Sequence, residues 1–230
     1  MVQGIQALSI RDYFNYYFAG IIWLLLAATV LVPNDLSWIL TQFKATADAI
    51  GLVVLGVLLI TVPYLVGFVL SPLGSQVTSC LLHQFGNPID WVVIHVKAPS
   101  KDRHKGERLP ERQLKAVAAK VRVTFHLAKE VAPSDLPKWF FPIRAYVSTN
   151  TPPGADMAAR NNNLANLSES LLIPFPTLLI VTGWRLSVVW ADWWSLPIIG
   201  AIVAWSLAWS YLYLREHWVK HVYRQFLAAK

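Results

Sequence analysis

Charged residues and cysteines are scarce in this sequence. Only 14% of the 230 residues are charged, while 55% are apolar and the mean hydropathy is positive, which is unusual for a soluble domain. The single cysteine, Cys80, cannot form a disulfide within the chain, and we expect it to be a small buried side chain in a reducing compartment. The shortage of charge favours a membrane protein over a soluble one.

Recognisable catalytic patterns are also missing. The sequence has no Gly-x-Ser-x-Gly elbow, no glycine-rich loop that would cradle a phosphate and no pair of carboxylates within an apolar run. No acidic residue lies well inside any apolar run, which weakens the case for a transporter or a proton-coupled pump. The sequence therefore gives no support for an enzyme, although it does not exclude one, and we expect no bound cofactor.

The apolar residues are concentrated in two blocks, 13–72 and 171–214. Each block is long enough for two helices of about 20 residues, the length that crosses a bilayer. The fold class that this pattern predicts is an all-α integral membrane protein with a mainly helical cytoplasmic insert between its second and third spans. The four predicted spans cover about 14–32, 50–70, 171–190 and 193–214, so that each block forms a hairpin.

The distribution of lysine and arginine predicts the orientation. Thirteen of the twenty lie in the insert, 73–170, and four in the tail, 215–230. By the positive-inside rule these segments are cytoplasmic, and both chain ends are then cytoplasmic too. The same rule accounts for most of the net charge of +7, so we expect the partner to be the lipid bilayer and not a nucleic acid contacted directly.

The insert is predicted to hold an amphipathic helix over 73–85 and two further helices over 110–127 and 138–147. Trp91 to Val96 is short and apolar, which fits either a strand or a buried helix. A helix from about Ala155 to Trp190 would be about 54 Å long, well beyond the bilayer core of about 30 Å. The fourth span likewise continues as a helical tail through Phe226.

Two prolines interrupt the third span near its cytoplasmic end. Pro174 and Pro176 each remove a backbone hydrogen bond and clash with the preceding turn, so a kink is expected there. The kink is either a hinge between the cytoplasmic and membrane parts or a static bend.

Small residues recur in the second and fourth spans. They let helices approach closely, which favours packing within one subunit or between subunits of a homo-oligomer. The candidate packing positions are Gly51, Gly56, Gly67, Gly200, Ala204 and Ala208.

Polar residues cluster just cytoplasmic of the third span. On a helix Asn162, Asn166 and Glu169 share one face, and Arg160 shares another with Asn163. This polar collar is either a solvated face or a ring around a vestibule that meets a partner, and Arg144 is a further candidate for such a contact.

His217 and His221 are four residues apart on the predicted tail helix and could share a metal. No glutamate occupies the middle position that a zinc-protease motif needs, and the other four histidines are isolated. We therefore interpret the pair as interfacial histidines and expect no metal.

Four segments resemble small bacterial membrane proteins that are often encoded beside antiviral (antiphage) defence genes. The resemblance lies in the RDYFNYYFAG stretch from Arg11, the FPIRAY segment from Phe141, Arg160 with the NLSESLL run, and the YRQF tail from Tyr223. It implies a multi-pass protein of the bacterial inner (plasma) membrane that acts as an effector: a cytoplasmic part senses a partner or signal, and oligomeric spans perturb the bilayer.

Three functions follow from these patterns as hypotheses. The first is an oligomeric membrane effector or channel-like protein. The second is a membrane anchor or assembly partner whose insert recruits a soluble cytoplasmic protein through its aromatic surface. The third is a lipid-modifying membrane enzyme that uses His217 and His221.

Overall fold

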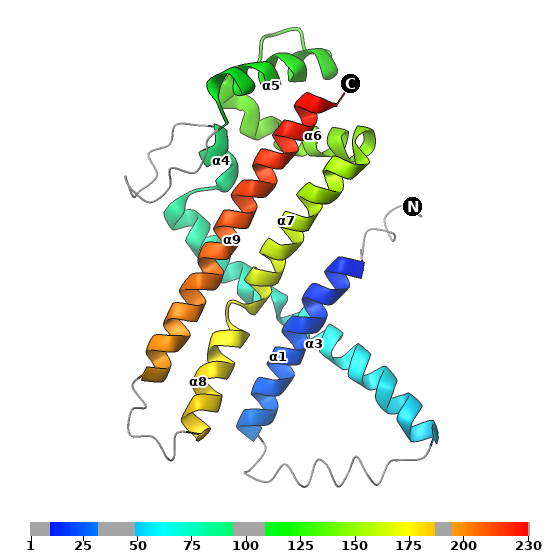
Figure 1. Ribbon diagram of the computed structural model, residues 1–230, viewed down its shortest axis with the longest axis vertical. Coiled ribbons are helices and arrows are strands. Elements are labelled where there is room, and N and C mark those ends of the chain that lie inside the picture. The colour runs from blue at the N-terminus through cyan, green and yellow to red at the C-terminus, as the bar shows by residue number, and fades with distance from the viewer. Residues whose placement is uncertain (1–9, 32–48, 94–108, 187–194, 230) are drawn as a thin grey trace. The chain divides into compact units, whose positions relative to one another are not determined.

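The computed structural model describes residues 10–31, 49–93, 109–186 and 195–229, and these ranges are helical with no strand. The chain divides into two compact units. Unit 1 comprises Met1–Val77 and Asn166–Trp209, and unit 2 comprises Thr78–Ala165 and Ser210–Lys230. Figure 1 shows the elements in chain order: α1 (Ile10–Leu31), α3 (Ala49–Phe85), α4 (Pro88–Val93), α5 (Glu111–Thr124), η2 (Pro133–Asp135), α6 (Leu136–Asn150), α7 (Pro152–Leu171), α8 (Pro174–Leu186) and α9 (Ser195–Ala228).

Two described helices are long and apolar enough to cross a membrane, at Gly56–Val93 and Ser195–Ala228. A third candidate arises if the bent pair Ala155–Leu171 and Pro174–Trp184 is one span. The apolar part of α1, Asn15–Leu31, is shorter. The described residues therefore form an all-helical protein with two or three candidate spans, compared with the four that the sequence predicts.

α3 continues past the point where the sequence predicts the second span to end. Its 37 residues pass through Pro72. Proline cannot donate to the carbonyl of Phe68, but the Ser71 hydroxyl donates to that oxygen instead (Oγ to O, 3.0 Å). The separate helix predicted over 73–85 is therefore the last part of α3.

The long helix predicted from about Ala155 to Trp190 is broken in the structure. α7 ends at Leu171, a two-residue turn follows, and α8 begins at Pro174 with a bend of 40°. Because Pro174 and Pro176 have no amide hydrogen, the carbonyls of residues 170 and 172 cannot receive the bond that would continue the helix. The kink that these prolines predict is thus a complete break.

Helix packing in unit 1 depends on two glycines. Gly20 of α1 faces the backbone of Pro63 in α3, and Gly67 of α3 faces the backbone of Tyr16 in α1. A Cβ atom at either glycine would overlap backbone atoms of the other helix, so only glycine permits this close crossing. α1 also packs against α8.

The outside of unit 1 is apolar. Large side chains that are about half exposed or more cover α3 and the first part of α9, a surface that suits contact with lipid tails. They include Val57, Leu58, Leu59, Ile60, Leu65, Phe68 and Val69 on α3, and Ile198, Ile199, Ile202 and Trp205 on α9.

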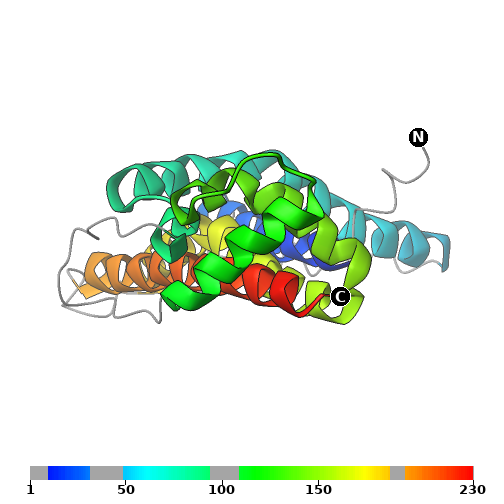
Figure 2. The ribbon, with the colours of Figure 1, turned by 90° about the horizontal axis from the view of Figure 1, so that it is seen from above.

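Unit 2 has an aromatic and aliphatic core formed by α5, α6 and the last part of α9. Val117 and Val121 of α5 and Phe140 and Ile143 of α6 are completely buried, at spacings that place each pair on one helix face. Figure 2 shows α5 lying across the end of α9. The stripe that α9 contributes to this core consists of Trp218, Val219, Val222, Tyr223 and Phe226.

α9 is one helix of 34 residues. The sequence predicts that the fourth span continues as a helix through Phe226, and α9 does so to Ala228. At 1.5 Å per residue its length is about 51 Å, which exceeds the bilayer core by about 20 Å. One helix therefore supplies both an apolar candidate span and a wall of the unit 2 core.

The segment after α3 resolves an alternative that the sequence leaves open. The run Trp91 to Val96 fits a strand or a buried helix, and its first three residues belong to the short helix α4, while 94–96 lie outside the described residues. The Trp91 indole donates to the carbonyl of Phe85 (2.9 Å). Cys80, predicted to be buried, is exposed, because Leu82 and Phe85 are the side chains of α3 that pack against the small cluster around Tyr211.

Candidate functional site

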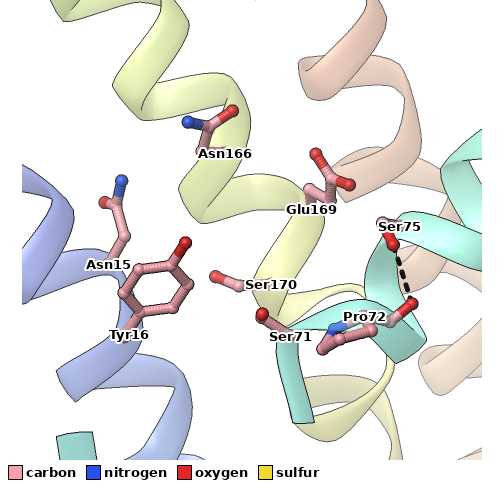
Figure 3. A pocket seen from close by; sticks show the side chains of 8 residues that line it. All are labelled: Asn15, Tyr16, Ser71, Pro72, Ser75, Asn166, Glu169 and Ser170. Carbon is pink, nitrogen blue, oxygen red and sulfur yellow. Dashed lines mark hydrogen bonds between the residues drawn. The ribbon is translucent and has the colours of Figure 1, made fainter. Parts of the chain in front are cut away.

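A polar pocket of about 280 Å³ lies in unit 1 where α1, α3 and the end of α7 meet (Figure 3). Seven of its eight lining side chains are polar, in a unit whose outer surface is apolar. Polar side chains gathered within an otherwise apolar unit are candidates for a functional role, since burying them is costly. The lining residues are Asn15 and Tyr16 from α1, Ser71, Pro72 and Ser75 from α3, and Asn166, Glu169 and Ser170 from α7.

The α3 wall of the pocket is built around Pro72. Ser71 donates its hydroxyl hydrogen to the Phe68 carbonyl, and Ser75 donates to the Pro72 carbonyl (Oγ to O, 2.8 Å; dashed in Figure 3). Both hydroxyl hydrogens are engaged by backbone oxygens of the same helix. Toward the pocket these two serines can therefore offer only acceptor oxygens.

The α7 wall is the last turn of a helix. Ser170 donates its hydroxyl hydrogen to the Leu167 carbonyl (2.9 Å), so its oxygen also faces the pocket as an acceptor. The chain turns directly afterwards because Pro174 cannot continue the hydrogen-bond ladder. The carboxyl end of a helix carries a partial negative charge, which adds to the charge of the Glu169 carboxylate in the same turn.

Close backbone contacts set the width of the pocket. Gly74 of α3 faces the backbone of Glu169, where a Cβ atom would overlap the carbonyl oxygen. On the other side of the pocket, α1 crosses α3 at Gly67, and this crossing places Asn15 and Tyr16 in the pocket wall. Asn15 is 9% exposed. The Tyr16 ring packs edge to face on Phe68, with centroids 5.5 Å apart.

Glu169 brings a charge to the pocket. Among the lining residues that the structure describes, it is the one ionisable carboxylate, and the others are uncharged. The serine oxygens and the carboxylate are acceptors, whereas the amide groups of Asn15 and Asn166 and the Tyr16 hydroxyl can both donate and accept. The pocket is therefore lined by a mixture of hydrogen-bond donors and acceptors.

The structure divides the predicted polar collar between the two units. Asn166 and Glu169 line the pocket of unit 1. Asn162 belongs to unit 2, where its Oδ1 accepts a hydrogen bond from Arg215. The other two collar positions are in unit 2 as well: Arg160 is exposed and Asn163 is half-buried.

Arg144 belongs to a stack of arginines and aromatic rings in unit 2. Its guanidinium lies 5.3 Å from the centre of the Trp218 ring, and the Arg215 guanidinium lies 5.3 Å from the same ring. Arg215 is also 5.3 Å from the ring centre of Tyr211. Cation–π contacts of this kind attach α6 to α9 and occupy both guanidinium groups within the unit.

The candidate packing residues have different surroundings. Gly67 faces the α1 backbone, and Gly200 faces Ile180 and the carbonyl of Pro176, whereas a Cβ atom at Gly56 would meet nothing within 4 Å. Ala208 is buried and Ala204 is half-buried, and both proposed hinge prolines are buried. Gly51 is in α3, but its side-chain surroundings lie outside the described residues.

His217 and His221 lie one turn apart on α9, within unit 2. The His217 ring packs on Tyr213, with centroids 4.1 Å apart and the ring planes tilted by 35°. Among the residues that the structure describes, no group of three or more histidine, cysteine, aspartate or glutamate side chains could hold a metal ion.

The stability of unit 2 is expected to fall as the pH drops below about 6.5, the usual pKa of histidine. Burial, and then the positive charges of Arg224 and His217, lower the pKa of His221 from its usual 6.5. The unfolded chain therefore binds this proton at a higher pH than the folded chain. The contribution of the neutral His221 side chain to the free energy of unfolding is complete above about pH 6.5 and is lost as the pH falls below that value.

The measurement is the thermal midpoint followed by tryptophan fluorescence from about pH 8 to pH 5. His221→Gln should flatten the decline, whereas the control His83→Gln, at an exposed position, should leave its slope unchanged. An identical slope in wild-type protein and His221→Gln would contradict the assignment.

Sequence reasoning identified Asn166 and Glu169 but missed the remaining polar residues of the pocket. Asn15 lies at the start of one apolar run, and Ser71 and Ser75 lie at the end of another, just before Pro72 and three residues after it. Polar residues around a proline inside a long apolar helix were the signal that could have found the two serines. No protein-family model, curated protein or solved structure matches the chain.

Proposed function

We propose that this chain is an oligomeric, channel-like membrane effector whose cytoplasmic part senses a partner or signal and whose spans perturb the bilayer. Its topology is two hairpins, 13–72 and 171–214, with the insert 73–170 and the tail 215–230 in the cytoplasm. Support comes from the lysines and arginines, seventeen of which fall in the insert and tail, and from the exposed apolar faces of α3 and α9. The membrane is the inner membrane of a bacterium, and the process served is antiphage defence.

The observation that carries this proposal is the continuity of α9. Its first part exposes Ile198, Ile202 and Trp205, while its last part buries Val222 and Phe226 in the core of unit 2. A ligand or partner that shifts the unit 2 core must move the helix that runs through it, because an uninterrupted helix is stiff along its axis. A signal in unit 2 therefore reaches the bilayer without a separate linker.

Interrupting α9 should abolish leakage. Liposomes loaded with a fluorescent dye are reconstituted with wild-type protein at increasing density, and leakage is expected to rise more steeply than linearly because subunits must associate. Tyr213→Pro removes the amide that bonds to the Trp209 carbonyl and breaks the helix between span and core. Tyr213→Ala, at the same half-exposed position, removes the ring alone and should leak like wild type.

Two results would count against the effector. The first is wild-type protein that never leaks at any density and has the mass of a single subunit by native mass spectrometry. The second is equal leakage by the proline and alanine variants, which would show that continuity of α9 is irrelevant.

A membrane anchor is the second candidate, and two side chains of unit 2 favour it. Val123 is 73% exposed on α5 and Phe141 is 62% exposed on α6, although neighbouring side chains of both helices are fully buried. Large apolar side chains exposed on a water-facing unit suit a protein partner. An anchor would show no leakage but would retain a soluble partner at fixed stoichiometry.

A further inference from the structure

We propose that a groove along α5 in unit 2 binds an acidic amphipathic helix of a soluble partner protein. The groove has a volume of about 630 Å³ and is lined by one face of α5 and by the segment that follows this helix, as far as Pro133. The inference rests on the proposed function, because it gives the chemistry of the partner that the cytoplasmic part senses. Shape, charge, backbone strain and distance from the bilayer each bear on the class of ligand.

The shape of the groove suits a helix. Its lining extends along α5 from Lys115 to His126, which is about 16 Å or three turns at 1.5 Å per residue. Ala118 and Ala119 are small, so another helix can approach the backbone of α5 closely at this point. Val123, one turn after Ala119, is 73% exposed, and an apolar side chain of a partner would remove it from water.

Charge favours an acidic helix. Lys115 and Arg122 line the groove. Lys115 is paired with Glu111 (Nζ to Oε1, 2.7 Å) and Arg122 with Glu130 (3.6 Å), but the four side chains are between 47% and 90% exposed. Exposed ion pairs are weak, so the carboxylates of a partner can exchange with them. Residues 111–131 contain five lysines and arginines and two acidic residues, so this segment attracts a negatively charged one.

Backbone strain is located at His126, which lines the groove just after the end of α5. Its φ of 52° lies in the left-handed region, which is unfavourable for a residue with a Cβ atom and is usually occupied by glycine directly after a helix. The side chain is exposed, so it does not fill the core of unit 2. Strain at an exposed side chain beside a groove is typical of a residue that contacts a ligand.

The distance from the bilayer favours a soluble partner. Lys120 attaches α5 to the end of α9, because its Nζ donates to the carbonyls of Leu227 (3.4 Å) and Ala229 (Figure 2). Under the proposed topology the span in α9 ends at Leu214, and the chain continues for about 22 Å from there to Ala229 at 1.5 Å per residue. The headgroup region is only about 5–8 Å thick, so we assign the groove to a protein segment and not to an anionic lipid.

The test uses full-length protein in nanodiscs of phosphatidylcholine and a fluorescein-labelled peptide of about 16 residues, which is roughly four helical turns. Leucine occupies the i, i+3, i+4 and i+7 positions of the peptide, and glutamate occupies the others. Fluorescence anisotropy should show saturable binding of one peptide per subunit. A peptide with lysine in place of glutamate should bind at least about tenfold more weakly, and so should one with serine in place of leucine.

Two alanines of α5 provide a matched pair of variants. Ala119 lines the groove, and Ala116, which is also exposed, is not among the described residues that line it. Ala119→Glu should weaken binding of the acidic peptide about tenfold or more, through its bulk and its charge, whereas Ala116→Glu should leave the affinity within about twofold. The two variants have the same net charge, so a difference between them reports the groove and not the charge of the whole protein.

His126→Gly tests the strained position. Glycine removes the Cβ atom that the left-handed backbone disfavours, so the thermal midpoint should not fall. Binding of the acidic peptide should nevertheless weaken roughly threefold or more, because a hydrogen-bonding side chain is lost from the groove. A lower midpoint with unchanged peptide affinity would contradict the role of His126 in binding.

Equal binding of the lysine peptide, or equal effects of Ala119→Glu and Ala116→Glu, would overturn the proposal. Displacement of the peptide by ATP or by vesicles of phosphatidylglycerol, each compared with sodium chloride at equal ionic strength, would also overturn it, because the groove would then hold a small anion or a lipid. The comparison among peptides uses wild-type protein alone, so a variant that folds poorly cannot obscure it. Binding requires no leakage, so the failure of the effector proposal and the failure of this one are distinguishable.

Discussion

Gly67→Ala is expected to destabilise unit 1 by about 1–3 kcal/mol, and toward the upper end of that range. The added Cβ atom would overlap the carbonyl of Tyr16, and a backbone atom cannot rotate away as a side chain can. The helices α1 and α3 must therefore separate, which also opens the packing of Tyr16 on Phe68. With about 2–4 °C per kcal/mol in a chain of this size, the thermal midpoint should fall by several degrees.

The matched control is Gly56→Ala in the same helix. A Cβ atom at Gly56 meets nothing within 4 Å, and alanine is a better helix former than glycine by about 0.8–1 kcal/mol. The two identical substitutions should therefore shift the midpoint in opposite directions, as measured by tryptophan fluorescence and by the monodispersity of the purified protein. An equal fall of the thermal midpoint in the two variants would mean that Gly67 is not at a helix crossing.

The same contact can be tested from its other side. Gly20→Ala should be as damaging as Gly67→Ala, because its Cβ atom would overlap the carbonyl of Pro63. The loss of stability in the double variant should be smaller than the sum of the losses in the two single variants, since one separation of the helices relieves both overlaps.

Local patterns predicted the helices of unit 2 better than they predicted the course of α3. Trp218, Val222 and Phe226 recur at helical spacing, and all three are buried where α9 extends beyond the predicted span. At Pro72 the sequence predicts a stop, because proline breaks a helix unless another donor reaches the carbonyl that it leaves. The Ser71 hydroxyl is that donor, and its orientation depends on the folded helix.

The pocket could be predicted only in part for a similar reason. Asn166 and Glu169 are close in sequence and share a helix face, so the pattern alone brings them together. The opposite walls come from Asn15 and Ser75, which are far from them along the chain. No local spacing encodes that contact, which follows from the crossing of α1 and α3 and the close approach at Gly74. Asn162, which shares the same predicted face, instead bonds to Arg215 of unit 2.

The exposed aromatic residue of α6 illustrates a further limit of the sequence. Trp139, Phe140 and Phe141 are consecutive, and composition alone predicts an aromatic core without saying which ring enters it. The helix turns about 100° per residue, so adjacent rings cannot share a face. Phe140 is fully buried and Phe141 is 62% exposed, a distinction that depends on how α6 lies against α9.

Phe140→Ala is therefore expected to destabilise unit 2 by about 3–5 kcal/mol, whereas Phe141→Ala should change its stability by no more than about 0.5 kcal/mol. The Phe140 ring packs edge to face on Trp218 (centroids 4.9 Å apart) and on Tyr223 (5.8 Å), so its removal leaves a cavity between α6 and α9. The thermal midpoint should fall by roughly 6–20 °C for Phe140→Ala and stay nearly constant for Phe141→Ala.

The pair of variants also discriminates between the two proposed functions. If unit 2 recruits a partner through its exposed ring, Phe141→Ala should release that partner while the midpoint is unchanged. If unit 2 instead signals through α9, Phe140→Ala should disturb leakage because it loosens the core around the helix that reaches the bilayer, and Phe141→Ala should leave leakage intact. Equal destabilisation by both variants would contradict the packing of α6, since one helix face cannot bury both rings.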